Sequence, residues 1–480
     1  MIHRNHELPA AMTDRRFAMP GALVAIVVAA GLGLAAPRAL ATPEERVDAL
    51  AEAIVETGNL PSLSIAIWRN GRIEYARAFG YADLEGRVPA TTSTQYRCAS
   101  VSKVITATAV ARLVQEGRLD LDAPVHGYVP SWPEEPVITA RQLSGHLAGV
   151  SHYRGEDRID RSRHYDSVTE SLDVFRDSER AGPPGESYVY STHGFTLLSA
   201  VAEGASGTDF LTLLEEEVYT PLGMTDSGPD MRTSPGPNMS TLYGRNRRDA
   251  FEIGQPEDPS YKWAGGGLVS TPSDLVRLAG GYLSDFLDDE LVEEMWTTQR
   301  TNDGEETGVG IVWRIGEDGQ GRRVIHHSGS MGGARTTVAI WPETGEAIAL
   351  MTNIVWPSDI HLTGMMMMEA WREDPSGGLE VGAAAYNGEM VRGDEAAAAT
   401  GELSLEGESG WITTPEPFAE WAGDLTVERM PIRHIAGDRY ALVSPFGLLP
   451  LEIRRDGDRV IGIMDRGSTR WGFVVQGDVR

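Results

Sequence analysis

Strand-like segments near both ends of one long region, with helices between them, most constrain the fold of this chain. An alternating stretch at Ser62–Trp68 is followed by the hairpin turn Asn70-Gly71 and a returning strand at Glu74–Phe79. Three later segments are also rich in strand-forming residues: Val309–Arg314, Arg335–Trp341 and Ala347–Asn353. Four segments between these groups show the helical spacing of apolar residues: Val101–Glu116, Val168–Phe175, Phe195–Glu203 and Asp274–Leu283. We therefore expect an α+β fold, in which distant strands complete one antiparallel sheet flanked by helices, with a mostly helical subdomain inserted.

The sequence predicts a main domain, a linker and a small second domain after an N-terminal segment. The main domain, residues 42–374, opens with a helix capped by Thr42 and closes with a helical stretch at Leu362–Trp371. Residues 375–417 are rich in Gly, Ala and Glu and show little periodicity, so we expect a linker. Residues 418–480 are expected to form a small β-rich domain. Its predicted strands are Tyr440–Val443, Leu449–Ile453, Val460–Met464 and Trp471–Val475.

The N-terminal segment, residues 1–41, has the parts of a secretory signal peptide. Basic residues precede an apolar run at Ala22–Ala36, and the small-x-small site Ala39-Leu40-Ala41 follows. The run is about 15 residues, shorter than the roughly 20 that span a membrane. We therefore expect an exported protein, periplasmic or extracellular. The alternative is an uncleaved anchor that tethers an envelope-assembly factor to the membrane, which is the one case in which membrane contact is expected.

Charge and composition exclude several kinds of partner. The 70 acidic against 42 basic residues give a formal net charge of −28, so nucleic acid would be repelled. The single cysteine, Cys98, excludes an internal disulfide, and we expect it to be buried and inert. His326 and His327 are adjacent with no third ligand at metal spacing, so we expect neither a metal nor another cofactor.

The chain has only two lysines, Lys103 and Lys262, and one of them follows a serine at helical spacing. Ser100 and Lys103 are three residues apart at the start of a predicted helix, so their side chains can share a face. Serine is a weak nucleophile that needs a base, and a lysine serves as one only when burial or nearby positive charge lowers its pKa. The plain alternative is a helix-capping serine beside a solvent-seeking lysine.

Two further stretches carry groups that suit acyl transfer. The first, Tyr188–Leu198, contains tyrosines that could move a proton as a phenolate if cations lower the pKa of the phenol. The second is His327-Ser328-Gly329-Ser330, where Gly329 would admit a close approach to the backbone. The Ser330 N–H could then pair with the Ser100 N–H as an oxyanion hole. The alternative interpretations are that the tyrosine only packs at the start of a helix and that the second stretch is an ordinary Gly/Ser turn.

Together these motifs resemble the serine β-lactamase and penicillin-binding-protein superfamily, in its class C-like branch. The resemblance runs through most of 42–372 and rests on three motifs in the family's order: Ser100 to Lys103, Tyr190 to Thr192, and His327 to Gly329. Several supporting stretches are also similar, including Gly145–Gly149, Pro221–Thr225 and Ala264–Thr271. Within the branch, the stretches around Tyr190 and Lys262 look most like the subgroup of serine β-lactamase-like proteins.

The resemblance implies a β-lactamase-like sheet and an acyl-enzyme mechanism without a cofactor. Ser100 would attack an acyl carbon, while Lys103 and Tyr190 take and return the proton. Thr192, His327, Ser328, Gly329 and Ser330 would line the substrate site, with Trp263 and Gly265–Gly267 as a wall. Thr192 replaces the family's usual Asn, as in the named subgroup, which puts efficient β-lactam hydrolysis in doubt.

The sequence leaves several substrate classes open. An amide or peptide hydrolase comes first, a carboxylesterase second and a true β-lactamase third; the competing class is a catalytically idle scaffold of the cell envelope. His327 would make substrate binding pH-sensitive if its pKa were near neutral. We expect Lys262 to form a structural salt bridge, and His146 and His152 to be structural histidines near the site.

Overall fold

The computed structural model describes residues 41–58, 60–153, 157, 159–231, 236–245, 250–254, 257–355, 359–373, 378–421, 427–466 and 469–475. The predicted signal peptide, residues 1–41, lies outside this set apart from Ala41. Within the described ranges, no helix combines the length and apolar character needed to cross a bilayer.

A seven-stranded antiparallel sheet joins the two ends of the main domain, as the sequence predicted. Strand β1 (Ser62–Arg69) lies between β2 (Arg72–Asp83) and the central strand β12 (Glu346–Thr352), and its Leu63 pairs with Thr352. The full order is β3-β2-β1-β12-β11-β10-β9, where the remaining strands are β3 (Val88–Pro89), β9 (Arg314–Glu317), β10 (Arg323–Met331) and β11 (Ala334–Trp341). The strand predicted at Val309–Arg314 is wrong, because Val312 has a φ of 70°, which interrupts an extended path, and β9 begins only at Arg314.

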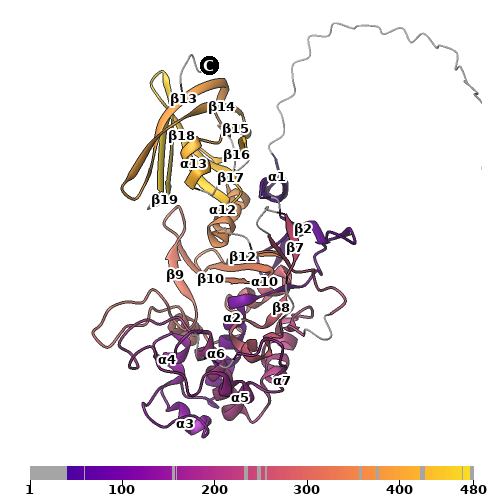
Figure 1. Ribbon diagram of the computed structural model, residues 1–480, viewed down its shortest axis with the longest axis vertical. Helices are drawn as coiled ribbons and strands as arrows, with labels where there is room; N and C mark the ends of the chain where they lie inside the picture. The colour runs from indigo at the N-terminus through magenta and orange to yellow at the C-terminus, as the bar shows by residue number, and fades with distance from the viewer. Residues whose placement is uncertain are drawn as a thin grey trace, which may run out of the picture. The chain divides into compact units, whose positions relative to one another are not determined.

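Helices cover both faces of the sheet because side chains alternate along each strand. Ile65 and Ile67 of β1 pack into one core cluster with α1 (Pro43–Thr57) and α12 (Ile360–Arg372), while Ala66 faces the other cluster with α2 (Ser102–Gln115) and α10 (Pro272–Gly281). Figure 1 shows α12 and α2 on opposite sides of the central strands. The Thr42 cap of α1 is confirmed, because its side chain accepts from the Glu45 N–H.

The inserted helical subdomain lies on the α2 side of the sheet (Figure 1). Its helices are α3 (Val125–Tyr128), α4 (Ala140–Ser144), α5 (Val168–Ser171), α6 (Thr192–Ser206), α7 (Phe210–Leu214), α8 (Thr220–Leu222), α9 (Trp263–Gly266) and α11 (Asp289–Met295). Helix α6 begins with a Ser191 cap, whose side chain accepts from the Gly194 N–H. Ser191 lies between Tyr190 and Thr192, the two residues of the second motif. The cap therefore fixes where this motif lies at the start of α6.

A small sheet ties the first motif to the stretch around α9. Strand β4 (Tyr96–Arg97) and β5 (Gly228–Pro229) flank β8 (Leu268–Ser270), and the Cys98 N–H donates to the Leu268 carbonyl at 2.8 Å. The chain just before Ser100 is therefore held against the chain just after α9. A separate hairpin pairs β6 (Tyr243–Arg245) with β7 (Phe251–Ile253).

The C-terminal part is a closed eight-stranded barrel that starts earlier than the sequence predicted. The linker predicted at 375–417 is wrong in its described part, because three barrel strands and the start of α13 (Glu416–Trp421) occupy it. Alanine-rich strands have low β-propensity, so their pattern is weak, yet pairing to β20 on one side and to one another gives each of them partners. The predicted strands after residue 418 are confirmed. The barrel strands are β13 (Glu380–Arg392), β14 (Glu395–Glu406), β15 (Ser409–Thr413), β16 (Arg429–Ala436), β17 (Arg439–Ser444), β18 (Gly447–Asp456), β19 (Arg459–Arg466) and β20 (Thr469–Val475).

Candidate active site

Ser100 and Lys103 lie side by side at the start of α2, as their spacing predicted. Ser100 is in the 3-10 turn η1 (Ala99–Val101), which runs directly into the helix, and Lys103 is in the helix's first turn. The Lys103 Nζ is 3.2 Å from the Ser100 Oγ. Ala99, just before the serine, has a φ of 47°, a left-handed conformation that non-glycine residues adopt mainly where the surroundings enforce it.

The Lys103 amine is fully buried and surrounded by acceptors. Its Nζ lies 2.5 Å from the Gly265 carbonyl oxygen and 3.1 Å from the Thr192 Oγ1, and 4.9 Å from the centroid of the Tyr190 ring. Burial lowers the pKa of Lys103 well below its usual value, and the positive charges of Lys262 and Arg314 lower it further. A lysine can act as a base only when burial or nearby positive charge lowers its pKa, and both effects are present at Lys103.

Tyr190 lies against both groups but keeps its proton. Burial raises the pKa of its phenol, and this outweighs the opposing effects of a hydrogen bond with the Ser100 side chain and of the Arg314 charge. The phenolate considered from the sequence alone is therefore wrong for the free protein. A neutral Tyr190 next to Ser100 can still donate one proton while it accepts another.

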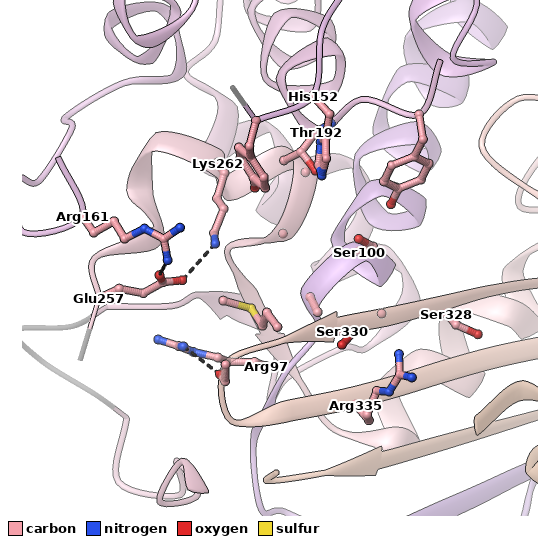
Figure 2. A pocket seen from close by; sticks show the side chains of 18 residues that line it. Arg97, Ser100, His152, Arg161, Thr192, Glu257, Lys262, Ser328, Ser330 and Arg335 are labelled. Atoms are coloured by element: carbon pink, nitrogen blue, oxygen red, sulfur yellow. Dashed lines mark hydrogen bonds and ion pairs between the residues drawn. The ribbon is translucent and has the colours of Figure 1, made fainter. Parts of the chain in front are cut away.

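Strand β10 forms the opposite wall, and Gly329 allows it to lie close to the serine. A Cβ on Gly329 would lie 2.4 Å from the Cys98 carbonyl oxygen and 2.9 Å from the Ser100 nitrogen, so any larger residue would push the strand away. The expected close approach at Gly329 is confirmed. Ser328 and Ser330, on either side of it, line the cavity next to Ser100 (Figure 2).

His327 lies behind the cavity wall rather than on its surface. It is 2% exposed, is absent from the described lining, and its Nδ1 is 2.9 Å from the Ser328 carbonyl oxygen. Burial, reinforced by the charges of Lys103 and Arg314, lowers the pKa of His327 well below its usual value. The near-neutral pKa considered from the sequence is therefore wrong, and the imidazole is uncharged at neutral pH.

A cavity of about 660 Å³ opens over these residues and carries more basic than acidic groups. On one side the Lys262 Nζ lies 2.9 Å from Glu257 Oε1, and Arg161 shares this carboxylate at 3.0 Å (Figure 2). Arg97 pairs with Asp230 at 2.6 Å. The expected structural salt bridge of Lys262 is confirmed. The full lining is Arg97, Ala99, Ser100, His152, Tyr153, Arg161, Tyr190, Thr192, Glu257, Lys262, Gly265, Gly266, Ser328, Gly329, Ser330, Met331, Gly332 and Arg335.

Several groups at the site could not be predicted from the sequence. The Gly265 carbonyl is a backbone acceptor that any residue would supply, and Arg314 belongs to a strand far along the chain from Lys103. Lys262 had a usable signal, because it is one of only two lysines in the chain. Of the wall predicted around α9, Gly265 and Gly266 are in the described lining, whereas Trp263 and Gly267 are not.

Neither a reactive thiol nor a metal-binding cluster is found among the described residues. Cys98 is fully buried, and burial raises the pKa of its thiol well above the usual value, as expected of an inert cysteine. Across the residues that the structure describes, no group of three or more His, Cys, Asp and Glu side chains is arranged to hold a metal ion.

Comparison of the chain with known proteins matches it to one family. The beta-lactamase family model matches residues 47–361. The chain is similar to the human mitochondrial serine beta-lactamase-like protein LACTB, with 27% identity over 378 residues, covering 59% of this chain and 69% of that protein.

Solved structures share the fold. The octameric penicillin-binding protein homologue from Pyrococcus abyssi has a TM-score of 0.58 at 21% identity, covering 90% of this chain and 99% of that one. The D-amino acid amidase from Ochrobactrum anthropi SV3 has a TM-score of 0.57 at 22% identity, covering 65% and 91%. Because the family model spans more than half of the sequence and includes Ser100, Lys103, Tyr190 and the β10 wall, the chain belongs to the beta-lactamase family.

Proposed function

We propose that this protein is a serine hydrolase that forms an acyl-Ser100 intermediate on amide, peptide or ester substrates. The observation that carries the proposal is the environment of the Lys103 amine. A neutral amine has two N–H donors and one lone pair. The two acceptors at Gly265 and Thr192 use the donors, which leaves the lone pair for the Ser100 hydroxyl at 3.2 Å.

In the first step, Ser100 Oγ attacks the acyl carbon while its proton passes to Lys103 Nζ. The carbonyl π bond becomes an oxyanion, for which the Ser100 and Ser330 N–H groups are the proposed donors. The bond to the leaving nitrogen or oxygen then breaks, and the leaving group takes a proton through the neutral Tyr190, which is replenished from Lys103. Water attacks the acyl-Ser100 ester by the reverse relay, releases the acid and restores the serine.

An amide or peptide bond is the favoured substrate. The fold likeness to a D-amino acid amidase supports this choice, and the Thr192 that replaces the usual Asn argues against an efficient β-lactamase. The Thr192 Oγ1 already accepts from Lys103, so one hydroxyl, rather than a whole amide group, remains to meet a β-lactam side chain. Esters, which have better leaving groups, are expected to react at the same serine.

The test is the intact mass of the protein after incubation with a fluorophosphonate and, separately, with a penicillin. We expect a phosphonate adduct in the wild type and in Ser284→Ala, a serine outside the described lining, but none in Ser100→Ala. Turnover of an ester or amide library should fall at least about a thousandfold in Ser100→Ala. A folded wild type without an adduct would contradict the proposal and favour a scaffold; a lasting penicilloyl adduct would move the substrate class toward penicillin-binding proteins.

A further inference from the structure

His146 holds the backbone on both sides of Tyr190. Its carbonyl oxygen accepts from the Val189 N–H at 2.8 Å, and its imidazole Nδ1 accepts from the Ser191 N–H at 3.1 Å. Val189 and Ser191 are the two chain neighbours of Tyr190. His146, from another segment of the chain, therefore holds the backbone on both sides of Tyr190 through hydrogen bonds.

The imidazole also packs directly on the phenol ring. The centroids of the His146 and Tyr190 rings are 4.4 Å apart with an interplanar angle of 40°, and Phe195 of α6 contacts the histidine ring at 5.3 Å. His146 is 2% exposed, so solvent does not compete for these contacts. Two backbone hydrogen bonds and one ring contact leave Tyr190 little freedom to move its hydroxyl relative to Ser100.

The hydrogen bond to Ser191 requires one particular form of the imidazole. Because Nδ1 accepts an N–H, the ring must carry its proton on Nε2, and protonation of Nδ1 would break the bond. Burial lowers the pKa of His146 well below its usual value, and the nearby Lys103, His327 and Arg314 lower it further. The lowered pKa favours the neutral ring, whose Nδ1 can accept from the Ser191 N–H.

The backbone of His146 is itself specialised. It follows α4 and has a φ of 62°, in the left-handed region that glycine and asparagine enter most readily. A histidine at this position is strained, which is typical of sites where the side chain has a task. This conformation turns the chain so that the carbonyl and the imidazole both face the Val189–Ser191 segment.

We propose that His146 is a positioning residue for Tyr190: it sets the phenol against Ser100 and Lys103, and it acts on catalysis only through that tyrosine. This inference rests on the proposed function, because it concerns the proton relay of the same site. It assigns to His146 more than the structural packing expected from the sequence.

The chain offers a matched pair of variants. His146→Gly removes the ring and its acceptor, while the carbonyl bond to Val189 and the left-handed backbone remain possible. His146→Asn also tolerates this backbone and restores a side-chain oxygen that can accept from the Ser191 N–H. We expect His146→Gly to lower kcat on an ester or amide substrate about 10- to 100-fold with little change in KM, and His146→Asn to recover part of the loss.

A double-mutant cycle with Tyr190→Phe separates positioning from general stability. If His146 acts through the Tyr190 hydroxyl, His146→Gly costs almost nothing more once that hydroxyl is gone, so the double variant should match Tyr190→Phe alone. If the role of His146 were purely structural, His146→Gly would lower kcat by the same factor in the wild type and in Tyr190→Phe. His126→Gly, at a histidine whose Nδ1 contacts the Trp132 carbonyl oxygen, is the control for loss of an imidazole elsewhere.

The outcomes distinguish this inference from the proposed function. Equal losses in the two backgrounds, an unchanged kcat in a folded His146→Gly protein, or a Tyr190→Phe variant with full activity would each overturn the role of His146 while Ser100→Ala remains inactive. Turnover that survives in Ser100→Ala would instead overturn the proposed function, and this inference with it. Thermal unfolding confirms that each variant is folded before its kinetics are compared.

Discussion

The charge of Lys262 lowers the pKa of the buried Lys103 amine, so the two lysines of this chain act on one site. Lys262 does so while paired to Glu257, which it contacts at 2.9 Å. Its ion pair is therefore both a structural link at the cavity edge and an electrostatic influence on the proposed base.

Removing the charge of Lys262 should shift the pH dependence of the reaction. Only the neutral Lys103 amine can accept a proton, so kcat/KM falls as the pH drops through its pKa. In Lys262→Met the pKa of Lys103 rises, and the acidic limb of the kcat/KM profile should move to higher pH. Lys262→Arg keeps the charge and should leave the limb near its wild-type position. Identical limbs in wild type and Lys262→Met would contradict this coupling.

Thr192 should matter through its hydroxyl rather than its shape. Thr192→Val keeps the volume but removes the acceptor for Lys103, which is worth about 0.5–1.5 kcal/mol, or up to about a tenfold loss of kcat. Thr192→Ser keeps the oxygen and should retain most of the activity. Steady-state kinetics on one ester substrate compare the two, and equal activity of the pair would sink the prediction.

Gly329→Ala should disturb the serine itself. The added methyl would meet the backbone at Cys98 and Ser100, so we expect kcat/KM to fall about 10- to 100-fold, with a lower melting temperature. Gly319→Ala, where a Cβ has nothing within 4 Å, is the matched control and should behave like the wild type. A Gly329→Ala protein with wild-type phosphonate labelling would show that β10 can move without affecting Ser100.

Substrate binding should not follow a histidine titration near neutral pH. Because the pKa of His327 is lowered well below its usual value, KM should stay constant between about pH 6 and pH 8. His327→Gln, which is neutral throughout, should show the same flat KM profile. An inflection near pH 6.5 that is present in the wild type and absent from His327→Gln would overturn this expectation.

The sequence predicted those parts of the site that depend on local spacing or on a special residue. Ser100 and Lys103 are neighbours on one helix, and Gly329 signals a close approach wherever it lies in the fold. The acceptors around Lys103 could not be predicted, because a backbone carbonyl such as that of Gly265 leaves no trace in the sequence. The sequence placed His327 in the substrate site through the family resemblance, but it could not show that the imidazole is buried behind the cavity wall.

The sequence predicted a strand correctly wherever the side chains on its two faces differ strongly in polarity or size. Strands β1, β2, β11 and β12 were predicted because their large apolar residues give clear patterns. Strands β13 and β14 were missed because alanines at 383–385 and 396–399 give little contrast between the inside and the outside of the barrel. Closure of the barrel, a long-range effect, supplies what local propensity lacks.

The pairing of β1 with β12 has a consequence for a chain that is still being made. Ser100 and Lys103 leave the ribosome early, but the strands β10 to β12 that wall the cavity and complete the sheet leave it much later. A nascent or truncated polypeptide that ends before β10 carries Ser100, the proposed nucleophile, without the wall that Gly329 brings against it. Such a fragment is expected to be inert toward acyl substrates, so reactivity appears only once nearly all of the family-matched region has been synthesised.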